Sequence, residues 1–410
     1  MKKQWPIEKI GNIAQKIAMG PFGSNIKVDN FVLSGVPVLN GANLTGVTLK
    51  EDSFNYVTEQ KAEELKNSLA YRGDIVVTHR GTLGQIVYIP KNSKFEKYLI
   101  SQSQFLVRLN SDKADCRFIT YFFHSAYGKY LLLSNASQVG VPALARPTTT
   151  FKLLEMALPS LGIQKKIADF LCRLDDKIEL NTKINHNLEE QAKAIFKSWF
   201  VDFEPFKNGK FVDSELGPIP EGWKVDDVYH IASVIYGAPF ASKLFTAEKI
   251  GKPIIRIRDL VTEAPQVNTP EVHPKGYLVR SGDIVVGMDG EFKAYVWGGD
   301  DAWLNQRVCV FKPKEGFSPS FVRYTIMPSL AAVEASEVAT TVIHLGKNDI
   351  DKFKALIPAK DTLDKFNGIT SHIHAQIVQH KIESRRLAAL RETLLPKLMS
   401  GEIDVSEIEV

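Results

Sequence analysis

The sequence has little of several features that would each identify a class of protein. It has three cysteines in 410 residues, Cys116, Cys172 and Cys309, which are far apart and form no CxxC pair. An odd, scattered set argues against a disulfide scaffold or a structural zinc site and favours a reducing cytoplasm. There is no run of about 18 apolar residues, and no apolar stretch follows the first charges. We therefore expect neither a membrane span nor a signal peptide.

Motifs for catalysis and cofactor binding are also missing. The chain contains no GxGxxG, GxxxxGK[ST], GxSxG or HExxH motif, and no Asn-Pro-Pro-aromatic tetrapeptide of the kind expected in an amino-methylating enzyme. One arrangement leaves an alternative open, because Asp283 followed by Glu291 and Lys293 could hold Mg²⁺ and activate water. We expect no catalysis, no resident cofactor and no metal site, with a self-contained nuclease or methyltransferase as the alternative.

The composition is that of a globular protein with several domains. Hydrophobic residues make up 44% and charged residues 24% of the chain, and 51 Lys and Arg balance 47 Asp and Glu. The charge is uneven along the chain: residues 1–150 hold 18 basic and 11 acidic residues, whereas residues 213–360 hold 17 and 19. A positive field over the first part favours a polyanionic partner, with scattered, solvated charge as the alternative.

The two halves of the chain repeat one another. The spacing between matching segments falls steadily from 218 to 199 residues and then stays constant. An ordered series of this kind indicates a duplication in which the globular parts tolerate changes of length. The matching segments are Trp5 with Trp223, residues 20–24 with 237–242, residues 35–38 with 251–254, residues 72–77 with 281–286, residues 104–107 with 306–309, and residues 158–159 with 357–358.

The end of each half differs from its globular part. Residues 163–200 contain no Pro or Gly, and their apolar residues recur in alternating steps of four and three, as in a coiled coil. The matching residues 363–395 repeat the pattern, so we expect two long helices that pair antiparallel; two ordinary amphipathic helices on separate domains are the alternative. Polar residues in the seam would fix its register. The expected seam residues are Ile167, Leu171, Leu174, Ile178, Asn181, Asn185, Leu188 and Ile195 in the first helix, and Phe366, Ile369, Ile373, Ile377, His380, Leu387, Leu390 and Leu394 in the second.

Together these patterns predict a mixed α/β (α+β) fold with two similar globular domains. Residues 74–78 and 283–287 are apolar runs after Gly-Asp turns and predict strands, while residues 118–132 and 321–333 have helical spacing. The predicted segments are a first domain (1–160), a long helix (161–202), a linker (203–222), a second domain (223–358), a second long helix (359–402) and a tail (403–410).

Polar loops stand at matching places in the two globular parts. Gln, Asn, Arg, His, Ser and Thr are the residue types that read base edges, and differing residues at matching places would give two specificities. An ordinary surface loop remains the alternative for each one. The candidate DNA-binding residues are Lys27, Thr78, His79, Arg80, Gln102, Gln104, Gln138, Arg146, Arg256, Arg258, Lys293, Arg307, Thr340, Thr341, His344 and Lys347.

Six segments give the chain a resemblance to a known family. They are residues 158–168, 174–181, 214–223 and 394–403, and the two Gly-Asp-Ile-Val-Val strands. In combination these resemble the specificity subunit of type I restriction-modification enzymes. The first copy departs from the pattern by opening at Trp5 without the Gly-Pro-Ile-Pro-Glu-Gly lead-in, and the second lacks Gln-Lys-Lys at residues 361–363.

The resemblance implies a non-catalytic, cytoplasmic subunit. It implies two target-recognition domains in a pseudo-twofold internal repeat, each reading one half of a split, asymmetric site on double-stranded DNA. It implies that the antiparallel helices hold the domains apart and set the gap between half-sites. Two modification subunits using S-adenosylmethionine, and restriction subunits using ATP and Mg²⁺, are the implied partners. A coiled-coil tether that only assembles partners is a further alternative.

Overall fold

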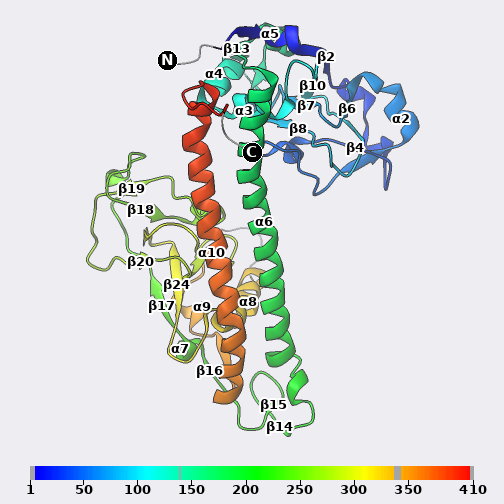
Figure 1. Cartoon of the computed structure of the whole chain (residues 1–410). Coiled ribbons are helices and arrows are strands. Elements are labelled where there is room, and N and C mark those ends of the chain that lie inside the picture. Colours follow the sequence, from blue (N-terminus) through cyan, green and yellow to red (C-terminus); the bar gives the residue numbers. More distant parts are fainter. Residues whose placement is uncertain (1–4, 138–139, 337–342, 407–410) are drawn as a thin grey trace. The chain divides into compact units, whose positions relative to one another are not determined.

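The computed structural model describes residues 5–137, 140–336 and 343–406. It consists of two compact units, Met1–Asp176 with Ala388–Val410, and Lys177–Leu387. The first unit contains a globular part that we call the first module (residues 5–158), and the second contains the second module (residues 223–358). Two long helices, α6 (Leu161–Phe200) and α10 (Lys360–Met399), each begin in one unit and end in the other (Figure 1).

The first module is built on a four-stranded antiparallel sheet whose central strands are buried on both faces. Ile75 and Val77 of one central strand face the helices, and Val76 faces a second, five-stranded sheet, so the whole run is apolar. The first sheet has the order β2 (Ala14–Met19), β10 (Gln104–Leu109), β7 (Ile75–Thr78), β8 (Ile86–Tyr88), and the second has the order β3 (Phe31–Val32), β5 (Asn55–Val57), β4 (Val36–Val38), β9 (Lys97–Leu99), β6 (Leu69–Tyr71).

The helical segment expected at residues 118–132 is two helices, because Ser125 interrupts it. Ser125 is extended, and its hydroxyl oxygen accepts a hydrogen bond from the Gly128 N–H at 3.1 Å, which caps the second helix. Short strand pairs complete the module. The remaining elements are α1 (Ile10–Ile13), α2 (Glu59–Glu64), α3 (Cys116–His124), α4 (Ala126–Leu133) and α5 (Pro147–Leu153), and the pairs β1 (Ile7–Lys9) with β13 (Glu155–Ala157) and β11 (Ala136–Ser137) with β12 (Ala143–Leu144).

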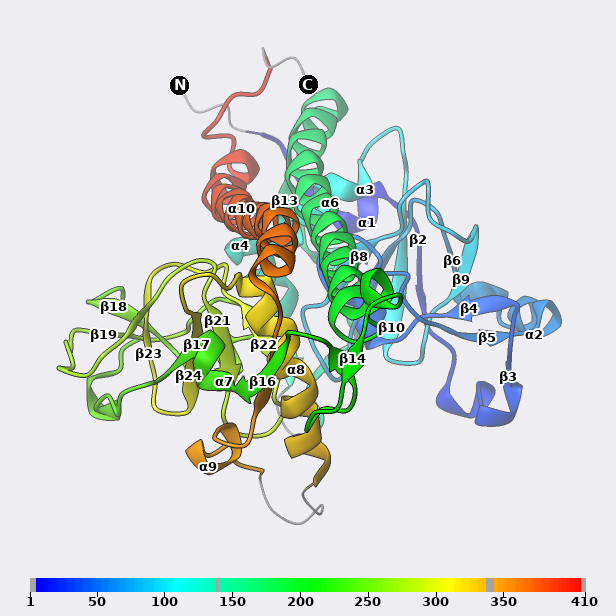
Figure 2. The same cartoon turned by 90° about the horizontal axis from the view of Figure 1, so that it is seen from below.

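The second module repeats this plan, as the sequence predicts. It has two four-stranded sheets, and the first has the same strand order as its counterpart (Figure 2). The sheets are β17 (Ala232–Tyr236), β24 (Val308–Pro313), β21 (Ile284–Gly287), β22 (Ala294–Val296), and β19 (Asn268–Thr269), β18 (Lys252–Ile255), β23 (Ala302–Leu304), β20 (Leu278–Val279). The other elements are β16 (Lys224–Asp227) paired with β25 (Lys354–Ile357), α7 (Val228–Ile231), α8 (Pro319–Ser336), α9 (Lys347–Ile350) and the 3-10 turn η7 (Ile257–Asp259).

The strand registers correct one part of the expected alignment. Val107 pairs with Ile75 in the first module, and Phe311 pairs with Ile284 in the second. Counting back along β10 and β24, the equivalent of Gln104 is Val308 and not Gln306. The match of residues 104–107 to 306–309 was therefore wrong by two residues. It relied on a shared Gln and Val, which locate equivalent residues less reliably than the hydrogen-bond register does.

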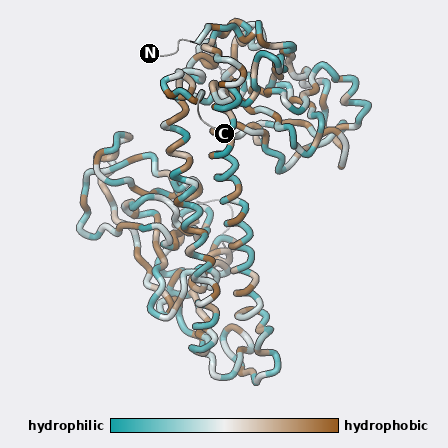
Figure 3. Tube along the Cα trace, in the orientation of Figure 1, coloured by the Kyte–Doolittle hydropathy of each residue, from teal (hydrophilic) through white to brown (hydrophobic). Residues whose placement is uncertain are grey.

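The long helices run antiparallel within each unit. In the second unit Asn185 contacts Ile377 and His380, while Phe200, farther along α6, packs on Phe366, which is earlier in α10. In the first unit the cluster that buries Ile167 and Leu171 of α6 also buries residues near the end of α10. Hydrophobic and hydrophilic residues alternate along both helices (Figure 3). None of the helices in the described part of the chain meets the length and hydropathy of a membrane span.

Burial along the helices places most, but not all, of the expected seam. Ile167, Leu171, Asn181, Asn185, Phe366 and Ile377 are buried, and Leu174, Ile178, Leu188, Ile195, Ile373, His380, Leu387 and Leu394 are half-buried. Ile369 and Leu390 are exposed, so assigning them to the seam was wrong. Buried Thr370 takes the place of Ile369, and its hydroxyl donates to the Phe366 carbonyl at 3.0 Å. A search of the sequence for apolar residues does not find Thr370, because it is a polar residue whose hydroxyl is hydrogen-bonded within its own helix.

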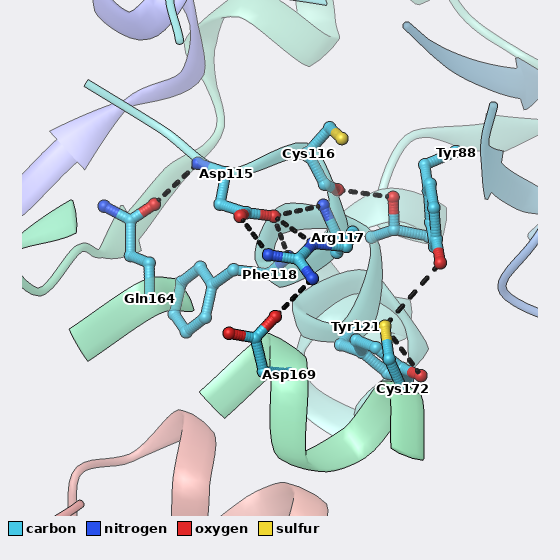
Figure 4. Close-up of polar contacts among 10 residues, drawn as sticks. Tyr88, Asp115, Cys116, Arg117, Phe118, Tyr121, Gln164, Asp169 and Cys172 are labelled. Atoms are coloured by element: carbon cyan, nitrogen blue, oxygen red, sulfur yellow. Dashed lines mark hydrogen bonds and ion pairs between the residues drawn. The ribbon is translucent and has the colours of Figure 1, made fainter. Parts of the chain in front are cut away.

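A buried polar network fastens the first module to α6 (Figure 4). The Gln164 amide accepts a hydrogen bond from the Asp115 N–H at 2.9 Å and donates to the carbonyls of Lys113 and Pro159. Arg117 forms an ion pair with Asp169 on the next turn of the helix. In the second unit Asn367 plays the matching part, accepting from the Ser318 N–H and donating to the Gly316 carbonyl.

The linker after α6 turns the chain back toward the second module. Phe203 adopts a left-handed conformation with a φ of 52°, so the chain leaves the direction of α6 at this residue. The segment contains η5 (Glu204–Phe206) and the strand pair β14 (Phe211–Val212) and β15 (Ile219–Pro220). The Trp223 ring packs on Phe200, Phe203 and Phe206, so aromatic residues from the two ends of the linker contact one another.

Candidate nucleic-acid interface

Three loops of the first module meet where β7 ends. The His79 N–H donates to the Ser103 carbonyl at 2.9 Å, and the His79 carbonyl accepts from the Leu144 N–H at 2.8 Å. Farther along, the Gly81 N–H donates to the Pro142 carbonyl at 2.9 Å. These bonds extend the sheet beyond β7 and hold the loops together. We call residues 79–81, 101–104 and 142–144 the first loop junction.

The second module forms the same junction with the same backbone hydrogen bonds. The Met288 N–H donates to the Arg307 carbonyl at 2.9 Å, and the Leu345 N–H donates to the Met288 carbonyl at 2.8 Å. The Gly290 N–H donates to the Ile343 carbonyl at 3.1 Å. We call residues 288–290, 305–308 and 343–345 the second loop junction. Because the same backbone hydrogen bonds hold both junctions, the difference between the junctions at equivalent positions lies in their side chains.

Two of the side chains expected to read bases are buried in the first module. Gln104 is 0% exposed, and its Oε1 accepts from the Ser101 N–H at 2.9 Å, while its Nε2 has no partner among the described residues. Thr78 is also buried, and its hydroxyl donates to Gln85 at 3.0 Å. Both residues therefore shape the junction from inside, and we correct their assignment as direct base contacts.

The exposed candidates of the first junction are Arg80 and Gln102. Arg80 has no ion pair or side-chain hydrogen bond in the described ranges, so its guanidinium is available to a ligand. Gln102 is exposed, and its amide lies against Gly23, where a Cβ atom would be 2.1 Å from Oε1. His79 is half-buried with Nε2 3.0 Å from the Gln102 carbonyl, and burial lowers its pKa, which keeps the ring neutral at pH 7.

The other candidates of the first module lie on flanking segments. Lys27 is exposed in the loop before β3, and Arg146 is exposed at the start of α5, where its φ of 46° is left-handed. Such a conformation is unusual for a side chain other than glycine, asparagine or aspartate, and it fixes the direction in which the chain enters α5. Gln138 lies outside the described residues.

The second junction carries a cluster of three charged or polar side chains. The Asp289 carboxylate lies 2.8 Å from His344 Nδ1 and 3.4 Å from Arg307 Nη1. The cluster joins one residue from each of the three converging loops. The side chains of Arg307 and His344 are 54% and 48% exposed, whereas that of Asp289 is 25% exposed, so the carboxylate sits beneath the other two. Sequence reasoning found Arg307 and His344 but did not assign a role to Asp289.

The remaining candidates of the second module divide into free and paired cations. Arg258 is exposed on η7, without an ion pair in the part of the chain that the structure describes, whereas Arg256 bonds to Asp259 at 3.2 Å. Residues Ile257 and Leu260 pack against Gly287, so η7 lies beside the end of β21. Lys347 pairs with Asp351 at 2.8 Å, and Lys293 pairs with Glu291 at 2.7 Å. Thr340 and Thr341 lie outside the described residues.

The residues of the nuclease alternative are committed to other contacts. The Asp283 carboxylate accepts hydrogen bonds from the Arg280 N–H at 2.9 Å and the Tyr277 hydroxyl at 3.1 Å. Glu291 and Lys293 pair with one another. No group of three or more His, Cys, Asp or Glu able to hold a metal ion occurs within the described residues.

Sequence reasoning also missed an exposed aromatic residue near the first junction. Phe22 is 84% exposed, whereas Phe240, its equivalent in the second module, is 6% exposed and packs on Trp303 and His273. Val28 and Leu33, which lie on either side of β3, are also exposed. No signal in one sequence separates two phenylalanines in matching Pro-Phe motifs, because burial depends on contacts with residues distant in the chain, such as those of Phe240 with Trp303 and His273.

Two modules with one backbone plan and different polar side chains, each fastened to the same pair of helices, are the architecture of a two-part recognition protein. The chain belongs to the family described as Type I restriction modification DNA specificity domain, which matches residues 3–190 and 220–384. The match covers both modules and part of each long helix. The resemblance in sequence and the duplicated fold therefore identify the same family, and the nuclease or methyltransferase alternative is set aside.

Relatives in this family match most of the chain. The protein named Type I restriction enzyme MjaIX specificity subunit, from Methanocaldococcus jannaschii, is 27% identical over 444 residues, which span 99% of this chain and 95% of that protein. The Type I restriction enzyme HindI specificity subunit of Haemophilus influenzae is 22% identical over 421 residues, spanning 81% and 87%. The crystal structure of the S subunit of a type I restriction-modification system from M. genitalium has the same fold, with a TM-score of 0.57 and 15% identity over 96% of both chains.

Proposed function

We propose that this chain is the DNA-recognition subunit of a type I restriction-modification complex, with one module for each half of a bipartite, asymmetric site on double-stranded DNA. The single observation that carries this proposal is the pair of loop junctions. Their backbones are fixed by the same hydrogen bonds, while Arg80, Ser103 and Ala143 of the first junction stand where Asp289, Arg307 and His344 stand in the second. Side chains that differ on a common frame suit the reading of two different sequences.

In this proposal the chain binds DNA, and its partner subunits carry out the chemical reactions. The paired helices set the gap between the half-sites and dock two modification subunits. Methylation with S-adenosylmethionine and cleavage driven by ATP with Mg²⁺ belong to modification and restriction subunits, in the cytoplasm where the DNA lies. The positive balance of residues 1–150 supports binding to the phosphate backbone, which adds affinity without sequence preference.

Selection from a random DNA library tests the proposal. The chain, assembled with modification subunits, should enrich a split motif with two defined halves and a fixed gap. Arg80→Ala should change the bases preferred in one half, and Arg307→Ala those in the other. Arg280 provides a control, because it is an exposed arginine that precedes β21, at the opposite end of this strand from the junction.

The outcomes separate the candidate functions. Arg280→Ala should leave both halves unchanged. Enrichment of one continuous motif, or loss of both halves with either junction variant, would contradict the assignment of one half to each module. Assembly with partners but no sequence preference would favour the coiled-coil tether.

A further inference from the structure

The second loop junction places a cationic donor beside an anionic acceptor on an exposed surface. Arg307 comes from the loop before β24, Asp289 from the turn after β21, and His344 from a segment that forms an antiparallel bridge with Asp289. The Arg307 and Met288 backbones are joined by a 2.9 Å hydrogen bond, so the guanidinium and the carboxylate stand on a common frame. The pair is thus held before any ligand binds.

His344 holds the carboxylate in place. Its Nδ1 lies 2.8 Å from Asp289 Oδ1 and 3.3 Å from Arg307 Nη1. A nitrogen cannot donate to Asp289 and accept from Arg307 at once, and the shorter contact assigns the Nδ1 proton to the bond with Asp289. Asp289 therefore accepts from both neighbours, which limits its rotation and that of Arg307.

We propose that Arg307 reads a guanine, and Asp289 the cytosine paired with it, in the major groove of the second half-site. This inference rests on the proposed function and names the base pair that this junction selects. Arg307 offers donors alone, in a planar fork, and among the four bases only guanine presents two adjacent acceptors, N7 and O6, in the major groove. Adenine presents a donor beside N7, and thymine a single acceptor beside a methyl group.

The carboxylate distinguishes base reading from a phosphate contact. An anion 3.4 Å from the guanidinium repels a phosphate, which weakens Arg307 as a backbone contact. The major-groove edge of a G·C pair instead presents two acceptors on guanine and then the N4 donor on cytosine. A donor fork beside an acceptor carboxylate is complementary to that edge. Asp289 thus acts both as a positioning residue for Arg307 and as an acceptor for cytosine.

The first junction cannot make the same contact. At its equivalent positions Arg80 replaces Asp289, Ser103 replaces Arg307 and Ala143 replaces His344. It therefore has no carboxylate beside its arginine among the three equivalent residues. The two modules differ in the charge pattern that they present, and the selected half-sites should differ accordingly.

Substitution of single guanines by 7-deazaguanine tests the proposal directly, because this base lacks the N7 acceptor and still pairs with cytosine. After selection has defined the site, each guanine in the second half-site is replaced in turn, and binding of the complex is measured. At one guanine the replacement should weaken wild-type binding about 10- to 150-fold, the range of one hydrogen bond to a charged group. The same replacement should have no effect on the Arg307→Ala complex.

A double-mutant cycle tests the part played by Asp289. Asp289→Ala should reduce discrimination against other base pairs at that position several-fold, and should add nothing in the Arg307→Ala background if it acts on this base pair with Arg307. Arg280→Ala is the control, since Arg280 is an exposed cation of the same module that precedes β21, at the opposite end of this strand from the junction.

Three results would overturn the inference while leaving the proposed function intact. They are a selected second half-site without guanine, normal binding of every 7-deaza substitution, and an equal loss of binding to all sequences in Arg307→Ala, as loss of a phosphate contact would give. Failure of the wild-type complex to select any bipartite site would instead reject the proposed function itself. Melting temperatures of the variants within experimental error of the wild type would show that the effects come from recognition and not from unfolding.

Discussion

Asn185 and His380 form a hydrogen bond across the two long helices, with His380 Nδ1 2.9 Å from Asn185 Oδ1. The other half of the Asn185 amide donates to the Ile377 carbonyl at 3.2 Å, and nearby Asn181 donates to Glu383 at 2.8 Å. Both asparagines are buried, so a displacement of one helix along the other would leave their amides unpaired at a cost of about 1–3 kcal/mol each. These polar contacts select one register, as buried polar residues do in coiled coils.

Replacing this pair by leucines should separate stability from register. The double variant Asn185→Leu with His380→Leu should melt at the wild-type temperature or above it, because apolar seam residues pack without desolvated polar groups. It should also accept DNA sites with more than one gap length, because Asn181 is then the one remaining asparagine of the two whose contacts disfavour a shifted pairing. Thermal melting and selection on a library of randomised gaps measure the two effects.

His186→Leu is the control for this experiment, since His186 is exposed on the same helix. It should change neither measurement. A double variant that melts near the wild-type temperature and keeps a single gap length would show that the Asn185–His380 contact is not needed to fix the register.

His374 should make the stability of the second unit depend on pH. It is largely buried on α10 with Nε2 3.1 Å from the Gly282 carbonyl, and desolvation lowers its pKa to about 4 from an ordinary 6.5. Between these values the unfolded chain binds a proton that the folded chain does not, so stability falls as the pH drops from about 6.5 to about 4. The loss is at most on the order of 3 kcal/mol.

His374→Gln keeps a donor for the Gly282 carbonyl and removes the titration. The melting temperature of this variant should fall less than that of the wild type between pH 7.5 and pH 5. Equal slopes for the two proteins would show that His374 is solvated or protonated in the folded state.

Gln164 should be among the most sensitive polar residues of the first unit. It is 0% exposed and makes three hydrogen bonds to the backbone, so Gln164→Ala leaves the Asp115 N–H and two carbonyls unpaired. The expected loss is about 2–4 kcal/mol in the free energy of unfolding. Asn367→Ala in the second unit should cost less, because Asn367 is only half-buried and water can replace its two bonds. Chemical denaturation of the two variants compares them, and a larger loss for Asn367→Ala would reverse this ranking.

Truncation of the phenylalanines in the two matching Pro-Phe motifs should change the free energy of unfolding by very different amounts. Phe240→Ala removes a buried ring and should lower the free energy of unfolding by about 3–5 kcal/mol. Phe22→Ala removes an exposed ring and should change it by less than about 0.5 kcal/mol. Thermal or chemical denaturation of both variants makes the comparison. A similar loss for both would mean that Phe22 is covered in solution.

The repeated fold could be predicted from the sequence, because its signals are local. The Gly-Asp turn followed by Ile-Val-Val is an apolar run of strand length, and both copies form the central strand expected of them. The long helices likewise follow from a heptad pattern without Pro or Gly. These features depend on residues close together in the chain, so one sequence contains them.

Contacts between distant residues could not be predicted in the same way. Arg307, Asp289 and His344 come together through backbone bonds between three loops, and nothing in the spacing of these residues shows it. Gln104 was misassigned for a related reason. The sequence alone does not distinguish a glutamine at a strand end whose amide faces solvent from one whose amide faces the core. Composition indicated the polar segments only approximately, since Thr78 and Gln104 lie at strand ends, and the direction of each side chain depended on the tertiary fold.

The long helices should set the length of the gap between the two half-sites. A four-residue insertion in α6 after Leu188 should lengthen the preferred gap by one or two base pairs, since four residues add about 6 Å of helix and each base pair adds about 3.4 Å. The compact units suggest a cleaner form of the experiment. Matched insertions of four residues between Asp176 and Lys177 of α6 and between Leu387 and Ala388 of α10 leave every contact inside each unit unchanged.

Both half-site sequences should stay as they are in the matched variant, because neither loop junction is altered. Four residues turn the helix by about 40° beyond a full turn, while two base pairs rotate the DNA by about 70°, so the complex has a small rotation to absorb. Selection from a library with randomised gaps gives the new preference. The control is the single insertion between Asp176 and Lys177 of α6, without the one in α10, and it should lower the melting temperature because it shifts one helix against the other. An unchanged gap in the doubly inserted protein, folded and bound to DNA, would show that the helices do not set it.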